Sequence, residues 1–238
     1  MKHNLQSLLE QKLFEESQQF QHELTEPLSK LLTQNLTLDQ IDAIWVACTF
    51  GQAWEPLKLS PWCGIFTQNQ LDLMAFRQDL EYFYIDSYAH KINYEQACVL
   101  LKDVIEKFDD EASQDNTLYF SHSGAILKFL AYLGIDKPNE FLKHDSDIRK
   151  KHWNTSARDS FASNVAFVFL KKPCQKIGML INEELTKIPA CDNQLWCPYE
   201  KFKEIFQSYN SSGCNFSKIC NLNNLEEVQY INTEEETF

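Results

Sequence analysis

The sequence predicts an α/β protein, in which a mostly helical N-terminal part precedes a portion of a sheet with its helices. Apolar residues recur at helical spacing through most of the first 112 residues. Residues 117–133 then read as a short strand, a polar turn and an amphipathic helix. Two dense aliphatic and aromatic runs between residues 161 and 182 have the composition of strands. Helical and strand patterns in this order are typical of an α/β fold.

The helical part contains four segments with apolar residues at every third or fourth position. They are residues 5–32, with a break expected near Pro27, and residues 38–50, 67–84 and 94–108. Thr37 is placed to cap the second segment and Asn93 the fourth, because their side-chain oxygens can accept hydrogen bonds from free N–H groups. An acidic connector, residues 109–116, follows.

The second part begins with the strand expected at 117–121 and the helix expected at 124–133. The runs at 161–170 and 177–182 are expected to form a hairpin around Pro173. Their high density of apolar residues predicts that both faces of these strands are buried.

We therefore expect three regions. They are a mostly helical portion at 1–112, the C-terminal part of an α/β core at 113–190, and a cysteine-rich, partly disordered tail at 191–238. The tail includes a short helix expected at 202–209. Beyond Asn221 it is acidic and has few residues that could be buried.

The formal net charge of −12 and the pI near 4.9 restrict the possible partners. Nucleic acid is excluded, because phosphate backbones are bound by Lys and Arg. No run approaches about 20 apolar residues, so no membrane span is expected. The segment Met1–Leu5 opens a polar stretch without the apolar core of a signal peptide.

Eight cysteines form an even set, which favours disulfides. Cys191 with Cys197, and Cys214 with Cys220, can each close a small loop. Cys98 lies in an apolar helical pattern and is interpreted as a buried thiol. No CxxC pair is present, so a zinc site is not expected.

Four Asn-x-Ser/Thr sequons accompany the cysteines, at Asn35, Asn154, Asn210 and Asn215. Together they favour a glycoprotein of the secretory pathway, in the endoplasmic reticulum lumen or outside the cell. Because this chain shows no signal peptide, we expect it to be a piece of a longer parent protein. The alternative is a short paralogue.

Two tryptophans are candidates for special roles. Trp62, beside Cys63, is expected to be a packing anchor. Trp153 is a candidate wall of a pocket, and the alternative is a half-buried loop anchor.

The most informative motif is His122-Ser123-Gly124, which separates the expected strand from the following helix. Open α/β sheets bind ligands at this edge. A helix N-terminus also offers free N–H groups and a positive dipole end, which suit a phosphate. His122 is therefore a candidate phosphate-binding residue, and a hydrogen-bonded structural histidine is the alternative.

Three other segments accompany this motif. They are Ser60-Pro61-Trp62-Cys63, Ala162-Ser163-Asn164 with the strand that follows it, and Met179-Leu180-Ile181-Asn182. In this order and at this separation, the chain from about Trp45 to Cys220 resembles the C-terminal portion of the multiple inositol polyphosphate phosphatases, a branch of the histidine acid phosphatases. The resemblance implies a histidine phosphatase-like core, here with a partial sheet, and an α-helical domain.

The resemblance also implies a chemistry. Family members use an Arg-His-Gly-x-Arg motif, whose His attacks phosphorus and whose arginines hold the phosphate. Here none of Arg77, Arg149 and Arg158 precedes a His. In the second motif a His contacts the phosphate, and a following Ala-Glu or Asp supplies the carboxyl that protonates the leaving oxygen. His122 matches this His as the catalytic and substrate-binding residue, whereas Gly124 stands in place of the acid.

The missing groups weaken the expected catalysis. A general acid is typically worth about a hundred- to ten-thousand-fold in rate. Asp115, Asp145 or Asp147 could replace it, although loop solvation and helix capping explain each of them better. The basic stretch Lys143–His152 could attract a phosphate, and a solvated mixed-charge loop is its alternative.

Three functions follow from these observations. The first is hydrolysis of phosphate monoesters of inositol polyphosphates, of the inositol hexakisphosphate type, without a metal or cofactor. The second is a pseudophosphatase that binds phosphorylated ligands, which Gly124 favours, and the third is an interaction module. We expect these 238 residues alone to be inactive. Because the family's first strand lies centrally, we also expect exposed apolar surface. The chain should then be poorly stable alone, or self-associate through its incomplete sheet.

Overall fold

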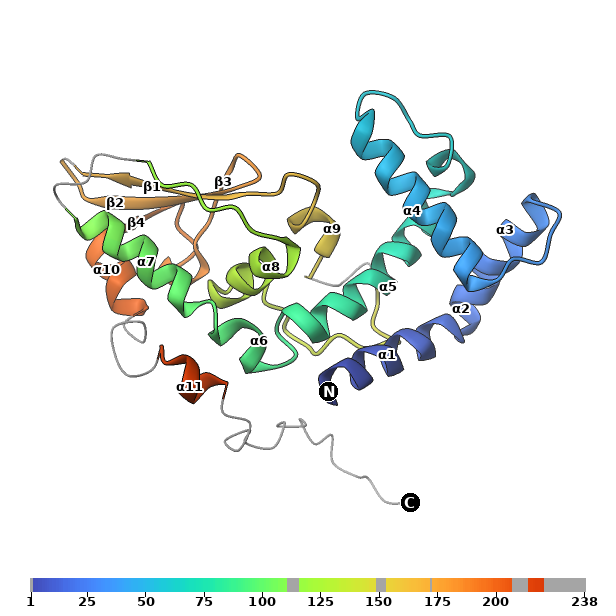
Figure 1. Ribbon diagram of the computed structural model, residues 1–238, viewed down its shortest axis with the longest axis horizontal. Coiled ribbons are helices and arrows are strands. Elements are labelled where there is room, and N and C mark those ends of the chain that lie inside the picture. The colour runs from blue at the N-terminus through green and yellow to red at the C-terminus, as the bar shows by residue number, and fades with distance from the viewer. Residues whose placement is uncertain (1, 111–115, 149–152, 172, 207–213, 221–238) are drawn as a thin grey trace, which may run out of the picture.

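The computed structural model describes residues 2–110, 116–148, 153–171, 173–206 and 214–220, which form a helical part and a part built on a sheet (Figure 1). The helical part comprises α1 (Lys2–Glu15), α2 (Gln18–Phe20), a π-helical turn (Gln21–Thr25), α3 (Glu26–Leu31), α4 (Leu38–Trp54), a 3₁₀ turn (Cys63–Ile65) and α5 (Gln68–Asp86). The remainder comprises α6 (Lys91–Glu95), α7 (Cys98–Asp109), α8 (Ser123–Tyr132), α9 (Thr155–Arg158), β1 (Val165–Leu170), β2 (Lys176–Ile181), β3 (Glu184–Thr186), a 3₁₀ turn (Pro189–Cys191), β4 (Trp196–Pro198), α10 (Tyr199–Ile205) and α11 (Phe216–Ile219).

Local capping signals place the starts of the long helices. Thr37 forms a reciprocal capping box with Gln40 at the start of α4, as predicted, and the helix continues four residues beyond Phe50. Thr67 and Gln70 do the same for α5. The first helix breaks before Ser17, whose hydroxyl caps α2, and not near Pro27. Pro27 lies in the first turn of α3, directly after the π-helical turn, and the backbone stays helical from one to the other.

The predicted role of Asn93 is wrong. Asn93 lies within α6, and α7 begins only at Cys98. Its side-chain amide donates to the carbonyl oxygens of Tyr84 (2.9 Å) and Ser87 (3.1 Å). Asn93 therefore satisfies free carbonyl groups at the C-terminal end of α5 and caps no helix start.

The sheet is antiparallel, with β2 at its centre. The predicted hairpin is confirmed, with Val165 opposite Ile181 and Leu170 opposite Lys176, and β2 also pairs with β3 and β4. Burial on both faces holds for most of β2, but it is wrong for β1, where half-buried and exposed residues alternate. A strand with one packed face shows this alternation.

The predicted strand at 117–121 is absent. Leu118 is 79% exposed and Phe120 is 94% exposed. No backbone hydrogen bond joins residues 117–121 to another described residue. A strand exists only when a neighbour accepts its ladder of hydrogen bonds, and none of the described strands pairs with this segment.

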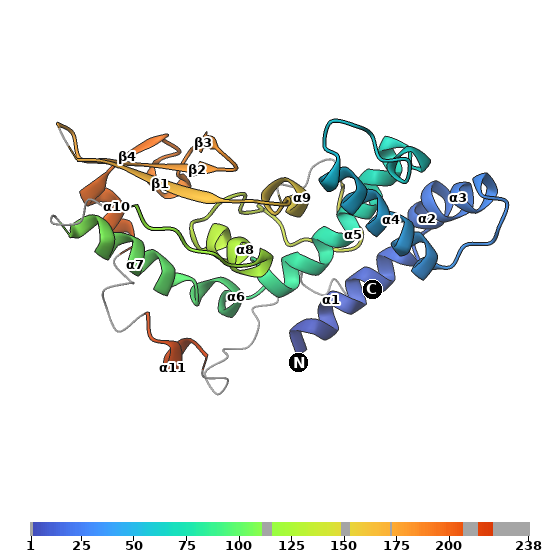
Figure 2. The same cartoon turned by 45° about the horizontal axis from the view of Figure 1, so that its top comes forward.

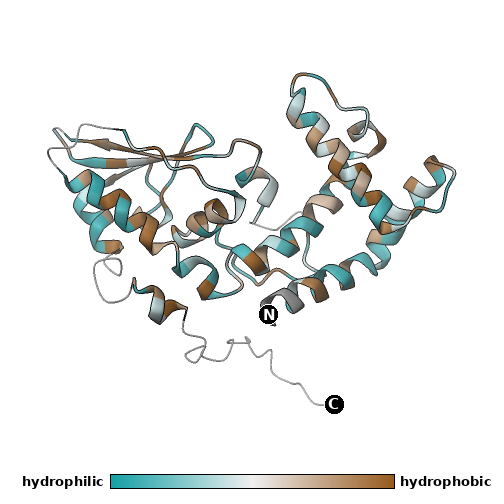
Figure 3. Cartoon of the chain, viewed as in Figure 1, coloured by the Kyte–Doolittle hydropathy of each residue, from teal (hydrophilic) through white to brown (hydrophobic). Residues whose placement is uncertain are grey.

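Two apolar cores stabilise the two parts. One is built mainly from α1 and the helices up to α5, and the other joins α7, α8 and α10 to the sheet. Figures 1 and 2 show α7, α8 and α10 along one side of the sheet. Leu101 and Ile105 are buried on α7, and Figure 3 shows such apolar positions alternating with hydrophilic ones along that helix.

The two tryptophan predictions are corrected by burial. Trp153 is fully buried in the first core, where its indole N–H donates to the Thr155 hydroxyl at 3.0 Å. It therefore packs within the core and is more deeply buried than a half-buried anchor. Trp62 is half exposed and is not a packing anchor.

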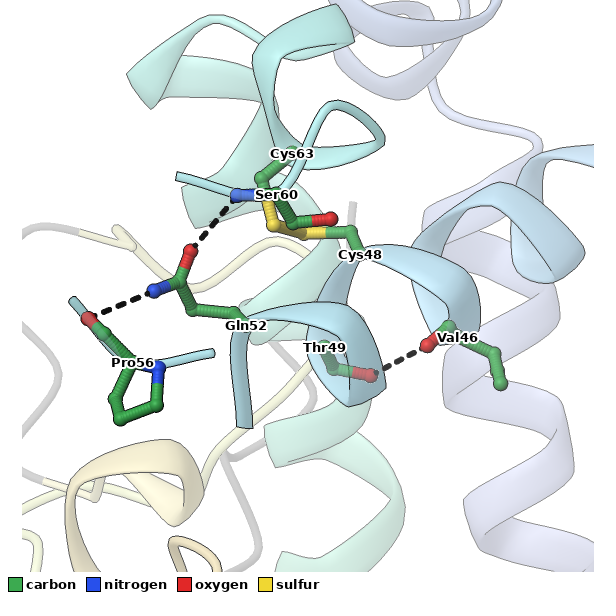
Figure 4. The surroundings of a disulfide bond; sticks show 7 residues. All are labelled: Val46, Cys48, Thr49, Gln52, Pro56, Ser60 and Cys63. Carbon is green, nitrogen blue, oxygen red and sulfur yellow. Dashed lines mark hydrogen bonds between the residues drawn. A yellow bond between two sulfur atoms is a disulfide. The ribbon is translucent and has the colours of Figure 1, made fainter. Parts of the chain in front are cut away.

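Three disulfides crosslink the described chain. Cys191–Cys197 is confirmed, whereas Cys214 pairs with Cys98 and not with Cys220. Cys98 is thus no free thiol. The third joins Cys48 to Cys63, across the loop that follows α4 (Figure 4). The tail beyond Asn221, for which disorder is predicted, lies outside the described residues, and the predicted domain boundaries stay predictions.

Candidate functional site

His122 lies at the N-terminus of α8. Its backbone is extended, and its carbonyl oxygen accepts hydrogen bonds from the N–H groups of Ala125 (3.0 Å) and Ile126 (3.3 Å). The ring Nδ1 also accepts from the Ala125 N–H, at 3.3 Å, which makes His122 the N-cap. Because Nδ1 accepts, the proton of the neutral ring is on Nε2. The side chain is exposed, so Nε2–H can donate to a ligand.

Asp159 approaches the first residue of α8 from the loop after α9. The Ser123 hydroxyl donates a hydrogen bond to Asp159 Oδ2, across 36 positions of sequence. Burial raises the pKa of the Asp159 carboxyl above its ordinary value. The hydrogen bond from Ser123 and the nearby His122 oppose this shift, and Asp86 adds to it. Asp159 therefore keeps its proton to higher pH than an ordinary aspartate.

Asp86 occupies the space beside Gly124. Its buried carboxylate is paired with Lys128 Nζ. A Cβ added at position 124 would lie 3.0 Å from Asp86 Oδ2 and 3.2 Å from Oδ1. The absence of a side chain at Gly124 is therefore what lets this carboxylate approach the first turn of α8.

One face of α5 holds the site together. Asp79, Tyr82 and Asp86 are spaced by three and four residues, so they lie along one side of the helix. Asp79 Oδ1 accepts from the backbone N–H of Thr155 at 2.7 Å, which fixes the start of α9. Burial raises the pKa of Tyr82, and the carboxylates of Glu81, Asp159 and Asp86 add to this, while a hydrogen bond with Ser123 opposes it.

The remaining candidates from the sequence, three aspartates and a basic stretch, are not recorded in contact with the group around His122. Asp115 and residues 149–152 of the basic stretch lie outside the described residues. The loop with Asp145 and Asp147 is tied to α1, where Glu10 lies 2.8 Å from both the backbone N–H and the ring of His144. The sequence reasoning missed Tyr82, Asp86 and Asp159, because only the packing of α5, α8 and the loop after α9 brings them together.

A surface hollow lies away from the His122 motif. A hollow of ≈ 510 Å³ lies at the opposite end of α8, where Tyr132, Gly134, Pro189 and Phe206 contribute to its walls. Within the described ranges, no group of three His, Cys, Asp or Glu side chains is arranged to hold a metal ion. No helix in the part of the chain that the structure describes is long and apolar enough to cross a membrane.

The α/β arrangement, the helical part and the histidine that caps α8 are as expected from the resemblance to the histidine acid phosphatases. The comparisons with known proteins agree with this assignment. The histidine phosphatase superfamily (branch 2) matches residues 3–182, and the chain belongs to that family. The resemblance inferred from the sequence is thus confirmed.

Two relatives share one protein name and have modest sequence identity to this chain. The chain is 27% identical over 188 residues to multiple inositol polyphosphate phosphatase 1 of Drosophila melanogaster, covering 75% of this chain and 40% of the relative. It is 25% identical over 206 residues to the protein of that name from Homo sapiens, covering 79% and 42%. The crystal structure of the phytase from D. castellii has the same fold, with a TM-score of 0.69 at 20% identity over 87% of this chain and 47% of the phytase. The chain therefore spans less than half the length of these proteins.

Proposed function

We propose that the N-terminus of α8 binds phosphate monoesters of inositol polyphosphates and that the protein is a phosphatase for this substrate class. The exposed Nε2–H of His122 at a helix N-terminus is the observation that carries the proposal. The relatives, which are named for the hydrolysis of inositol polyphosphates, support the substrate class.

The chain's own residues supply binding groups. His122 donates through Nε2, and the backbone N–H groups of Ser123 and Gly124 have no acceptor among the described residues. Such N–H groups and the positive end of the helix favour an anion. Because the printed sequence has no Arg-His-Gly motif, we propose that these 238 residues by themselves turn over little substrate.

Binding without turnover is the second candidate function. Gly124 favours it, since the family resemblance leads us to expect an acidic side chain there. A pseudophosphatase would use the same His122 contact and release no phosphate.

One experiment separates these functions. Phosphate release from inositol hexakisphosphate is measured between pH 4 and 7, together with the ligand-induced rise in melting temperature, for the wild type and His122→Ala. Ligand stabilisation that is lost in His122→Ala supports the site, and the release rate then distinguishes enzyme from pseudoenzyme. A melting temperature that the ligand leaves unchanged contradicts the binding proposal.

We further propose that the protein folds in the secretory pathway. The three disulfides are typical of an oxidising compartment. Asn35, Asn154 and Asn215 are exposed, as glycosylation requires, and Asn210 lies outside the described residues.

Self-association is a separate proposal. Residues 117–121 present apolar side chains and backbone groups without partners among the described residues. An unpaired segment of this kind is a template for pairing with another chain. We propose a second copy of this chain as the occupant.

A further inference from the structure

Two carboxyl groups lie where the expected acid is missing. Asp86 is within 3.0 Å of the position that a Cβ at Gly124 would take, and Asp159 accepts a hydrogen bond from the adjacent Ser123. Neither belongs to the His122 motif in sequence, since one comes from α5 and the other from the loop after α9. The packing therefore restores carboxyl groups to a turn whose own sequence lacks one.

The two carboxyl groups have different partners. Asp86 is buried in an ion pair with Lys128, so its charge is already matched. Asp159 accepts from a neutral hydroxyl, and its neighbour Arg158 is paired with Asp136, with 2.9 Å between Nη2 and Oδ1. When two neighbouring carboxyl groups differ in this way, the one without an ion-pair partner is better suited to carry a proton.

We propose that Asp159 is the proton donor of this site and that Gly124 and the Asp86–Lys128 pair are its positioning elements. The inference rests on the proposed function of the site at His122. Asp159 takes the role that the family resemblance leads us to expect at position 124, from a different part of the chain.

The overall reaction balances with water as the second reactant. An oxygen of water forms the new bond to phosphorus, and the bond between phosphorus and the ester oxygen breaks. The ester oxygen leaves with the bonding electron pair and takes the proton of Asp159. A proton from the attacking water then returns to the carboxylate, so that alcohol and phosphate are the products.

The charged and titratable groups that face Asp159 set the direction of its pH dependence. They are His122 at the start of α8, and Tyr82 and Asp86 on α5. As the pH rises through the raised pKa of Asp159, the carboxyl loses its proton and becomes an anion beside the bound phosphate. Ligand affinity therefore falls with rising pH, and replacing this carboxyl by a neutral amide removes that part of the fall.

The test measures binding of inositol hexakisphosphate by calorimetry from pH 4 to 7. Asp159→Asn keeps an acceptor for the Ser123 hydroxyl, so it preserves the local geometry. We expect the advantage of the variant over the wild type to grow as the pH rises, until the variant binds about tenfold tighter at pH 7. Asp72→Asn, which removes one exposed charge elsewhere on α5, is the matched control and should follow the wild type.

Ser123→Ala gives a second readout that keeps Asp159 itself. The Ser123 hydroxyl favours the ionised carboxylate, so its removal should move the fall in affinity to higher pH. If the wild type binds and the curves of wild type and Asp159→Asn coincide at every pH, Asp159 is not the donor, although the binding site stands. If neither protein binds at any pH, the proposed function fails and this inference fails with it.

Discussion

Gly124 is constrained by Asp86, a residue 38 positions earlier in the sequence. Gly→Ala in a helix normally stabilises a protein by about 0.5–1 kcal/mol, because alanine restricts the unfolded chain. Here the new methyl group would lie 3.0–3.3 Å from a buried, ion-paired carboxylate. We expect Gly124→Ala to lose about 1 kcal/mol of unfolding free energy through overpacking.

A double-mutant cycle with Asp86→Ala tests this coupling by urea denaturation. In the Asp86→Ala background the contact is gone, and Gly124→Ala should become stabilising. Gly64→Ala is the matched control, since a Cβ there would meet nothing within 4 Å. Equal effects of Gly124→Ala in both backgrounds would show that the two positions are uncoupled.

At the scale of elements, local signals were predictable and tertiary pairings were not. Thr37 caps α4 through groups within three residues of it, so the sequence alone reveals this helix start. The strand at 117–121 was predicted from its composition, but a strand depends on a neighbour that no local pattern contains. The same reason explains why the sequence reveals His122 as a motif but not the hydrogen bond from the adjacent Ser123 to Asp159.

The disulfide between Cys48 and Cys63 controls the loop between α4 and α5. It closes a loop of 15 residues, within which Gln52 accepts from the Ser60 N–H (3.1 Å) and donates to the Pro56 carbonyl (3.2 Å; Figure 4). A crosslink of this length is worth about 3 kcal/mol in the chain-entropy account. We expect Cys48→Ser/Cys63→Ser to lose most of that free energy of unfolding in urea.

Cys174→Ser is the control for this change, because Cys174 is exposed and forms no disulfide in the described structure. It should denature at the wild-type urea concentration. If the double variant does so too, the Gln52 contacts and the packing of α4 hold the loop without the crosslink.

At the scale of the whole molecule, the exposed segment 117–121 and the net charge oppose each other. Leu118 and Phe120 favour association through apolar burial, and pairing of two copies would satisfy their backbone groups. A net charge of −12 on each copy resists this approach, and salt screens the repulsion. We therefore expect self-association that strengthens with both protein concentration and ionic strength.

Sedimentation velocity of the wild type, Leu118→Ser/Phe120→Ser and Leu57→Ser tests this expectation. The double variant removes the apolar side chains of the segment and should stay monomeric. Leu57, which is fully exposed in the loop after α4, controls for the general loss of surface hydrophobicity, and its variant should associate like the wild type. If the wild-type chain remains monomeric at high salt and melts sharply and cooperatively, the unpaired segment 117–121 does not destabilise the monomer. The sheet would then need no second copy, and the apolar side chains at 118 and 120 would have to be explained without self-association.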